Sequence, residues 1–197
     1  MSVNESRATL EQPVQTVKRL YTYDELVAEF PESNQPCELW DGEIFSYSSP
    51  SFDHQQIVMR VARQLYDWAS AHNAGEVVHG PIDMVLSPHL VTQPDAVFIA
   101  CHRLGIIERA IRGPADLAVE VMSLGHRNRD RIQKRDLYEQ YGLKEYWLVD
   151  PEAQTVEVLH LENARYRLLM RATVGARISS KLLPGFELSV NAVLFGE

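Results

Sequence analysis

The stretch Asp116-Leu-Ala-Val-Glu-Val-Met122 has the composition of a buried β-strand, yet it carries an acid near its centre. Glu120 stands between Val119 and Val121, so folding strips water from its carboxylate. Burying even a neutral polar group without a partner costs roughly 2–7 kcal/mol, and an ionised carboxylate costs more. We therefore expect a cation to lie against Glu120.

Two further residues are candidates for the same place. Asp95 opens a second apolar strand, Pro94-Asp95-Ala-Val-Phe-Ile-Ala100. Lys134 belongs to a helix predicted over residues 129–141 and lies on its apolar stripe. Because this helix follows the Glu120 strand after a short connection, it is expected to pack back beside the carboxyl end of that strand. Lysine and glutamate can then approach each other.

These residue types indicate a metal site. If their strands are neighbours, Asp95 and Glu120 can be brought together to bind one Mg²⁺, or Mn²⁺ in its place, with waters and the backbone carbonyl of Val121. Asp83, in an earlier strand with the same alternation, is a further candidate ligand. A bound metal makes water more acidic and polarises a phosphate, while Lys134 orients the nucleophile and offsets developing charge. The pattern predicts phosphodiester hydrolysis.

Length and composition fit an ordinary globular protein. The 197 residues, 45% of them apolar, predict one domain over 16–197 after a disordered N-terminus at 1–15. The sequence shows neither an apolar run near the ~18 residues of a membrane helix nor a signal peptide, so we expect a soluble, cytoplasmic protein without membrane contact. Cys37 and Cys101 are interpreted as reduced thiols.

The charge pattern bears on nucleic-acid binding. A net charge of −8 argues against strong nonspecific attraction to nucleic acid, which depends on cationic contacts with phosphate. A local basic cluster nevertheless precedes Lys134, and it contains Arg127, Arg129 and Arg131. These arginines are candidates for contact with a nucleic-acid backbone. A solvated helix face is the alternative interpretation.

Periodicity and chain breakers predict the remaining elements. Helices are expected at 23–30, 53–72, 106–112 and 129–141, and strands at 76–79, 82–86, 93–100, 116–122 and 146–149. Asp41-Gly42 predicts an N-terminal hairpin, and residues 155–161 with 166–170 a C-terminal antiparallel pair, before a short strand at 183–188. The expected fold class is α/β, a mixed sheet flanked by helices with antiparallel hairpins near both ends.

Several motifs occur in the order of one known family: Glu38-Leu-Trp-Asp-Gly-Glu43, His54, Pro94-Asp95, Glu120-Val121, Lys134 before Leu137-Tyr138, Glu145-Tyr-Trp-Leu-Val-Asp-Pro151 and Leu183-Pro-Gly-Phe186. Over about residues 20–195 the chain resembles the Uma family of restriction-endonuclease-like proteins, within the PD-(D/E)xK nuclease superfamily.

The resemblance implies a restriction-endonuclease-like core with a defined set of site residues. Asp95 and Glu120 would bind the metal, and Lys134 would be the catalytic lysine. The superfamily pattern has a lysine where this chain has Met122, so the helix-borne Lys134 takes that role. The resemblance also implies two residues near the site: Glu38, binding metal or orienting metal-bound water, and His54, contacting phosphate.

Each candidate also has a structural interpretation. Glu120 and Lys134 could form an ion pair with no metal, Lys134 could extend to solvent, and Asp95 could be a turn residue leading into its strand. Acids such as Glu38 and Asp83 are common on solvated strand faces, and a histidine on an apolar stripe, such as His54, is often a core residue.

Three functions are therefore weighed. The first is a metal-dependent endonuclease acting on DNA. The second is a nuclease-like fold that serves as a DNA-binding or protein-interaction module with a weak or idle site. The third, sugar hydrolysis by two carboxylates, is disfavoured because it needs no lysine between the acids. Exposed sheet edges and the frequency of two-fold pairing favour a homodimer.

Overall fold

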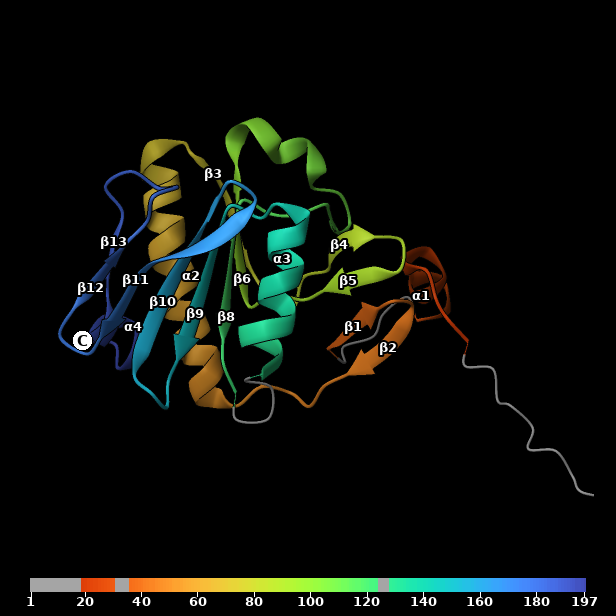
Figure 1. The fold of residues 1–197 in the computed structure, drawn as a ribbon, viewed down its shortest axis with the longest axis horizontal. Coiled ribbons are helices and arrows are strands. Elements are labelled where there is room, and N and C mark those ends of the chain that lie inside the picture. The colour runs from red at the N-terminus through yellow and green to blue at the C-terminus, as the bar shows by residue number, and fades with distance from the viewer. Residues whose placement is uncertain (1–18, 31–35, 124–127) are drawn as a thin grey trace, which may run out of the picture.

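A computed structural model of the chain describes residues 19–30, 36–123 and 128–197, so the predicted disordered segment 1–15 lies outside the described residues. These residues form two main β-sheets and a small third one (Figure 1). The six-stranded sheet has the order β11 (Arg165–Thr173), β10 (Thr155–Glu162), β9 (Glu145–Asp150), β8 (Leu117–Val121), β6 (Ala96–Ala100) and β3 (Gly75–His79). The five-stranded sheet has the order β2 (Glu43–Ser46), β1 (Cys37–Trp40), β5 (Leu90–Thr92), β4 (Met84–Ser87) and β7 (Ile111–Arg112). The third sheet pairs β12 (Arg177–Ser179) with β13 (Glu187–Ser189).

The centre of the six-stranded sheet is buried on both faces, which explains its nearly continuous apolar sequences. β8 pairs parallel with β9 and antiparallel with β6. A parallel neighbour requires a crossover, and here it consists of η2 (Arg129–Lys134), a π-helical segment, and α3 (Arg135–Tyr141). The left-handed backbone of Gly142, with φ of 78°, ends this helix. The predicted mixed α/β fold is confirmed.

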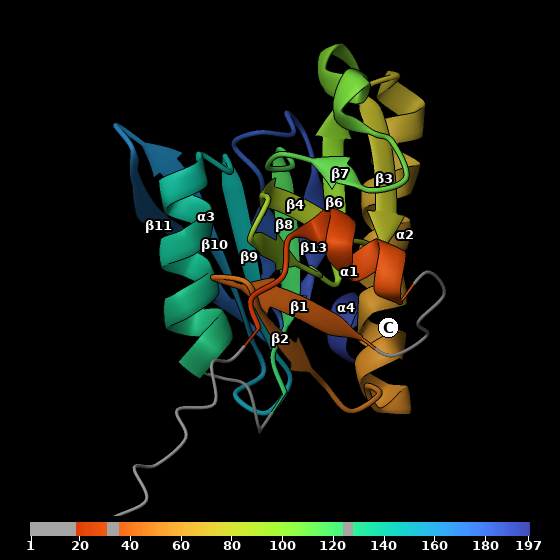
Figure 2. The same ribbon diagram turned by 90° about the vertical axis from the view of Figure 1, so that its right-hand side faces the viewer.

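Two helices cover opposite faces of the six-stranded sheet (Figure 2). The predicted apolar stripe of α2 (Phe52–His72) packs on one face, with Leu65 fully buried. On the other face α3 packs Tyr138 in a cluster that contains Ala118 of β8. Because side chains alternate along a strand, Glu120 points to the α3 face with Ala118. Within the described ranges, no helix is long and apolar enough to cross a bilayer.

The five-stranded sheet packs on the same face as α3, and Trp40 of the N-terminal hairpin packs against the cluster that contains Ala118 of β8. β1 and β2 are joined at Asp41 and Gly42, whose φ angles of 50° and 83° are left-handed, as a tight hairpin turn requires. Leu39 of β1 pairs with Val91 of β5. The predicted hairpin is confirmed, and α1 (Tyr23–Glu29), in the place of the helix predicted over 23–30, begins with a capping box formed by Thr22 and Glu25.

One predicted helix is wrong. Residues 106–112 instead end the 3₁₀ segment η1 (Cys101–Ile106) and then form β7. The N–H of Ile111 donates to the Asp83 carbonyl at 2.9 Å, so this backbone finds its partner beside β4 and not in its own segment. The sequence also does not predict β5, β12 or α4 (Val190–Leu194), which are too short to show a period.

Asp116 fastens the start of β8 to its surroundings. Its fully buried carboxylate accepts hydrogen bonds from the Ala100 N–H at 2.9 Å and from Lys144 Nζ at 2.7 Å, and Arg103 Nη1 lies 3.0 Å away. Burial raises the pKa of the Asp116 carboxyl, but the hydrogen bonds from Lys144, Ala100 and Arg103 outweigh burial and hold the pKa below its ordinary value. The charged form is therefore the one that stabilises the fold.

We expect Asp116→Asn to lower the free energy of unfolding at pH 7 by about 2–3 kcal/mol, because charged hydrogen bonds are lost. The folded-state pKa is depressed, so this stability is present above the unfolded pKa of about 3.9 and disappears as pH falls through the folded value. Urea unfolding at pH 7 and at pH 3 should therefore show a difference between wild type and variant that shrinks in acid. Asp67→Asn, in an exposed pair with Arg63, serves as the control. An equal difference at both pH values would contradict this assignment.

Candidate active site

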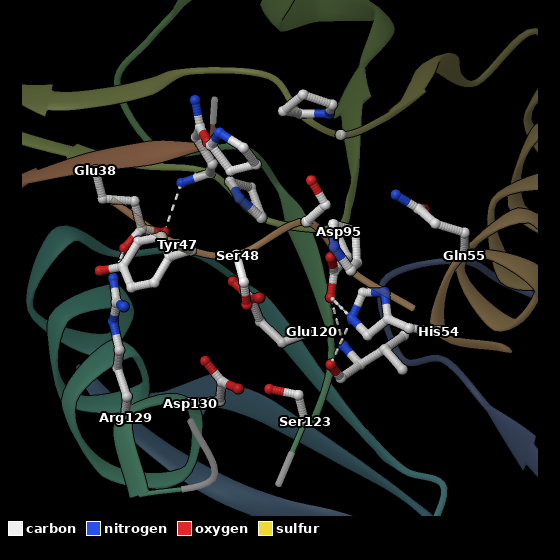
Figure 3. A pocket seen from close by; sticks show the side chains of 18 of the residues that line it. Glu38, Tyr47, Ser48, His54, Gln55, Asp95, Glu120, Ser123, Arg129 and Asp130 are labelled. Atoms are coloured by element: carbon white, nitrogen blue, oxygen red, sulfur yellow. Dashed lines mark hydrogen bonds and ion pairs between the residues drawn. The ribbon is translucent and has the colours of Figure 1, made fainter. Parts of the chain in front are cut away.

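A cavity of about 410 Å³ lies between the two main sheets (Figure 3). Its walls come from the carboxyl end of β8, the residues before β6, the first turn of α2, the start of η2 and the connection 47–51. The sequence-predicted site residues that line the cavity are Glu38, His54, Asp95, Glu120, Val121, Arg129 and Lys134. The structure thus gathers most of the predicted site.

Asp95 lies where β8 runs on past the start of β6. Its backbone N–H donates to the Val119 carbonyl at 3.1 Å, in register with the pairing of the two strands. Further along, the Val121 N–H donates to Asp95 Oδ2 at 2.7 Å. The side chain therefore replaces a backbone acceptor at this point of the ladder, which fixes the carboxylate beside the strand that carries Glu120.

His54 reaches this carboxylate from the first turn of α2 (Figure 3). Its Nε2 lies 2.9 Å from the Val121 carbonyl and 3.4 Å from Asp95 Oδ2. Burial lowers the pKa of His54, but the hydrogen bond and charge of Asp95 and the Val121 carbonyl outweigh it, so the pKa lies above its ordinary value. His54 is thus held against two oxygens and favours its protonated form.

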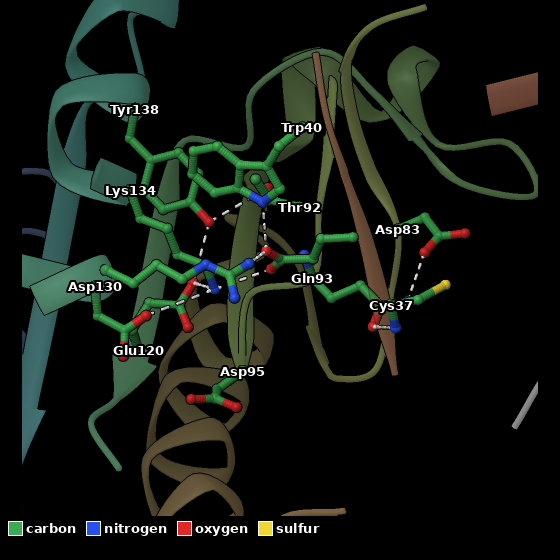
Figure 4. A network of polar contacts seen from close by, with 12 residues as sticks. Cys37, Trp40, Asp83, Thr92, Gln93, Asp95, Glu120, Asp130, Lys134 and Tyr138 are labelled. Carbon is green, nitrogen blue, oxygen red and sulfur yellow. Dashed lines mark hydrogen bonds and ion pairs between the residues drawn. The ribbon is translucent and has the colours of Figure 1, made fainter. Parts of the chain in front are cut away.

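Glu120 and Lys134 form a buried ion pair (Figure 4). Lys134 Nζ donates to Glu120 Oε1 at 2.7 Å, and the Tyr138 hydroxyl donates to the same oxygen at 3.0 Å. Burial raises the pKa of Glu120 above its ordinary value, and although Lys134 opposes the rise, the charges of Asp130 and Asp95 add to it. Burial lowers the pKa of Lys134, but attraction to Glu120 outweighs burial and raises it. Glu120, the buried acid predicted to need a cation, is thus paired with Lys134.

Glu38 lies on the five-stranded sheet and pairs with the cations of this site. Its buried carboxylate accepts at Oε1 from the Gln93 N–H at 2.8 Å, and Lys134 Nζ forms an ion pair with the same oxygen at 3.1 Å. At Oε2 it accepts from Trp40 Nε1 at 2.9 Å and from Arg129. With three hydrogen-bond donors and the ammonium of Lys134 around its two oxygens, Glu38 is better placed to position Lys134 and Arg129 than to bind a metal.

The three predicted phosphate-binding arginines have different positions. Arg129 lines the cavity, with its guanidinium 4.1 Å from the centre of the Tyr47 ring. Arg131 does not line it, because it pairs with Glu157 at 3.0 Å on β10. This pairing gives Arg131 a structural partner in the sheet, and its contact with nucleic acid stays a prediction. Arg127 lies outside the described residues.

Comparison with known proteins identifies the family. Residues 22–191 match the Uma2 family, described as "Putative restriction endonuclease". The chain belongs to the Uma2 family. No curated protein matches it. Among solved structures, the chain is similar to a putative nuclease belonging to DUF820 from Anabaena variabilis ATCC 29413, with a TM-score of 0.71 and 19% identity. The match covers 88% of this chain and 97% of the other, and it shows a shared fold.

The position of Asp83 in this Uma2 chain differs from the prediction. Its carboxylate accepts from the Tyr23 hydroxyl at 3.1 Å and from Gln93 Nε2 at 2.8 Å, it does not line the cavity, and Figure 4 shows it away from Glu120. The reason is sheet membership. Asp83 precedes β4, which belongs to the five-stranded sheet, so strand alternation alone cannot bring it to β6 and β8.

Two residues of the Uma2 site are missed by the sequence reasoning. Asp130 lines the cavity, with Oδ1 3.9 Å from Lys134 Nζ, and Tyr138 binds Glu120. Both lie four positions from Lys134 in the sequence, so the spacing of one helical face was an available signal for each.

The oxygens at this site suit a hard cation. Two carboxylates, Asp95 and Glu120, and the Val121 carbonyl lie around one end of β8. Among the described residues that line the cavity, four carboxylates (Glu38, Asp95, Glu120, Asp130) face two permanent cations (Arg129, Lys134). In the described part of the chain no three His, Cys, Asp or Glu side chains form a metal-binding group by themselves, so waters and substrate oxygens would complete the shell, as is usual for Mg²⁺.

We expect Lys134→Met to lower the free energy of unfolding by about 3–5 kcal/mol, because Glu120 would stay buried without its cation. The matched control is Lys181→Met, which breaks a 2.6 Å pair with Glu162 whose side chains are 52% and 43% exposed. That exposed pair should be worth at most about 1 kcal/mol. Denaturant unfolding measures both values, and equal losses in the two variants would contradict the buried pair's structural importance.

Proposed function

We propose that this protein is a metal-dependent nuclease that hydrolyses phosphodiester bonds of DNA. The observation that carries the proposal is the meeting of Asp95, Glu120 and Lys134 in one cavity, where Lys134 Nζ lies 2.7 Å from Glu120 Oε1. Membership in a family described as "Putative restriction endonuclease" supports nucleic acid as the substrate class. The similar Anabaena protein is described as a putative nuclease, which supports the same class.

Asp95, Glu120 and the Val121 carbonyl would hold Mg²⁺ or Mn²⁺. When bound, the metal supplies a more acidic water and a polarised phosphate. His54 keeps Asp95 and the Val121 carbonyl together and, when protonated, offers positive charge to a phosphate oxygen. Lys134 carries its charge into the cavity, where it orients the attacking group and offsets the charge that builds on the phosphate.

Glu38 and Arg129 support this arrangement. Glu38 Oε1 lies 3.1 Å from Lys134 Nζ and so fixes the direction of the lysine. Arg129 pairs with the other oxygen of Glu38 and lies over the Tyr47 ring, with its side chain 15% exposed. A guanidinium held this way faces the cavity with little freedom, which suits the recognition of a phosphate.

One observation favours a second candidate, a nuclease-like module that binds DNA or protein without cutting. The Glu120–Lys134 pair already gives the buried acid a partner, so the fold is satisfied without a metal. In that case the acidic site would be idle. Cleavage and metal binding distinguish the two candidates.

A homodimer stays a prediction. β11 lies at one edge of the six-stranded sheet and exposes Leu168 and Leu169, which supports pairing at this edge.

Supercoiled plasmid DNA should be nicked or linearised by the wild-type protein with Mg²⁺ or Mn²⁺. Asp95→Asn and Glu120→Gln should each reduce the rate by about a hundredfold or more, because each removes a metal-binding oxygen. Asp136→Asn, on an exposed acid of α3 that pairs with Arg135, should cut like the wild type. Gel analysis of the products measures the rates. A wild-type protein that binds DNA but cuts it with neither metal would favour the idle module.

Metal binding gives a readout independent of cleavage. Titration calorimetry with MgCl₂ or MnCl₂ should detect binding to the wild type, and saturation at about 100 times the dissociation constant should stabilise the fold by about 2.7 kcal/mol. Asp95→Asn should remove both effects, while Asp136→Asn should keep them. If the intact protein shows neither binding heat nor a shift in melting temperature with either metal, the metal site is refuted.

A further inference from the structure

The floor of the cavity is far less accessible than its rim. The side chains of Glu120 and Lys134 are 5% and 6% exposed, whereas that of Asp95 is 23% exposed. A phosphate must therefore enter the cavity to reach Lys134. It cannot be attacked while it lies on the outer surface of the protein.

The size of the cavity limits what can enter. Its volume of about 410 Å³ is in the range of small-ligand pockets and matches the scale of one nucleotide. A DNA duplex is much larger than this cavity, because its major groove alone is about 12 Å wide. Base pairing also holds each nucleotide of a duplex in place beside its neighbours. An unpaired strand has no such constraint and can turn a single phosphate inward.

The cations around the cavity fit a small contact with the nucleic acid. Proteins that grip a duplex neutralise several phosphates with lysine and arginine. The described lining residues supply two permanent cations, Arg129 and Lys134, and both are already paired with Glu38. This charge pattern suits one or two phosphates.

An exposed aromatic residue stands beside cavity-lining residues in the sequence. Phe52, the first residue of α2, is 77% exposed. It follows Ser51 and precedes His54 and Gln55, all three of which line the cavity. Exposed rings beside a nucleic-acid site commonly stack unpaired bases, and stacking is available only to a base that is free of its own helix.

We propose that the cavity takes one unpaired nucleotide of a DNA strand, with its phosphodiester at Asp95, Glu120 and Lys134 and a neighbouring base stacked on Phe52. This inference rests on the proposed function and narrows its substrate class from DNA in general to unpaired DNA.

The first experiment compares one labelled oligonucleotide as a single strand, as a blunt duplex and as a duplex with a central unpaired loop. The single strand and the loop should be cut at least about tenfold faster than the blunt duplex, with cleavage confined to unpaired positions. Cleavage of the blunt duplex at the rate of the single strand would overturn the inference and leave the nuclease assignment intact.

The second experiment tests Phe52. Phe52→Ala should raise KM for the single strand by about fivefold or more with little change in kcat, and Phe52→Trp should restore it, because a base stacks on either ring. Tyr66→Ala is the matched control, an aromatic on the same helix that is 56% exposed and, unlike Phe52, has no cavity-lining residue next to it in the sequence, and its KM should not change. Equal KM values for the wild type and Phe52→Ala would overturn the stacking role.

A binding measurement distinguishes this inference from the proposed function. Fluorescence anisotropy with Glu120→Gln protein, in Ca²⁺ to prevent cutting, should show tighter binding of the single strand than of the duplex. If the wild-type protein cuts no substrate, the proposed function fails and this preference alone supports the inference. Equal or tighter binding of the duplex would overturn it.

Discussion

The buried pair of Glu120 and Lys134 is the interaction on which the rest of the structure depends. Each residue is about one-twentieth exposed, so neither can keep its charge without the other. The requirement places η2 against the end of β8, because Lys134 Nζ must come within 2.7 Å of Glu120. It also draws in the second sheet, since Glu38 of β1 approaches the same ammonium. Two sheets and one crossover thus meet at a single pair of charges.

The cavity around this pair carries more negative than positive charge. Asp130 and Asp95 add to the burial of Glu120 and raise its pKa well above that of an exposed glutamate. An arrangement of this kind is costly in a fold that needs only stability. It fits the proposed metal site, in which a divalent ion would relieve the repulsion among the acids.

The sequence predicts the centre of the site well because the signals for it lie within short stretches of the chain. An acid within an apolar strand and a lysine on the apolar stripe of the next helix are visible in short stretches, and β6 and β8 are neighbours as expected. Prediction from the sequence fails where the position of a residue depends on which sheet its strand joins. Asp83 has the right alternation but precedes a strand of the other sheet, and residues 106–112 have a helical composition but end in β7, which pairs with β4. Likewise, Arg131 lies in a basic run, yet Glu157, 26 positions away, determines its direction.

The contact of Glu38 with Arg129 joins residues that are 91 positions apart in the chain. Such a contact forms late during biosynthesis, because the ribosome adds Glu38, Asp95 and Glu120 long before Lys134. Until then the acids have no lysine against which to be buried, and they stay hydrated. A partly translated polypeptide that ends before Asp130 therefore holds Glu38, Asp95 and Glu120 but not Lys134, whose ion pairs bring Glu38 and Glu120 together.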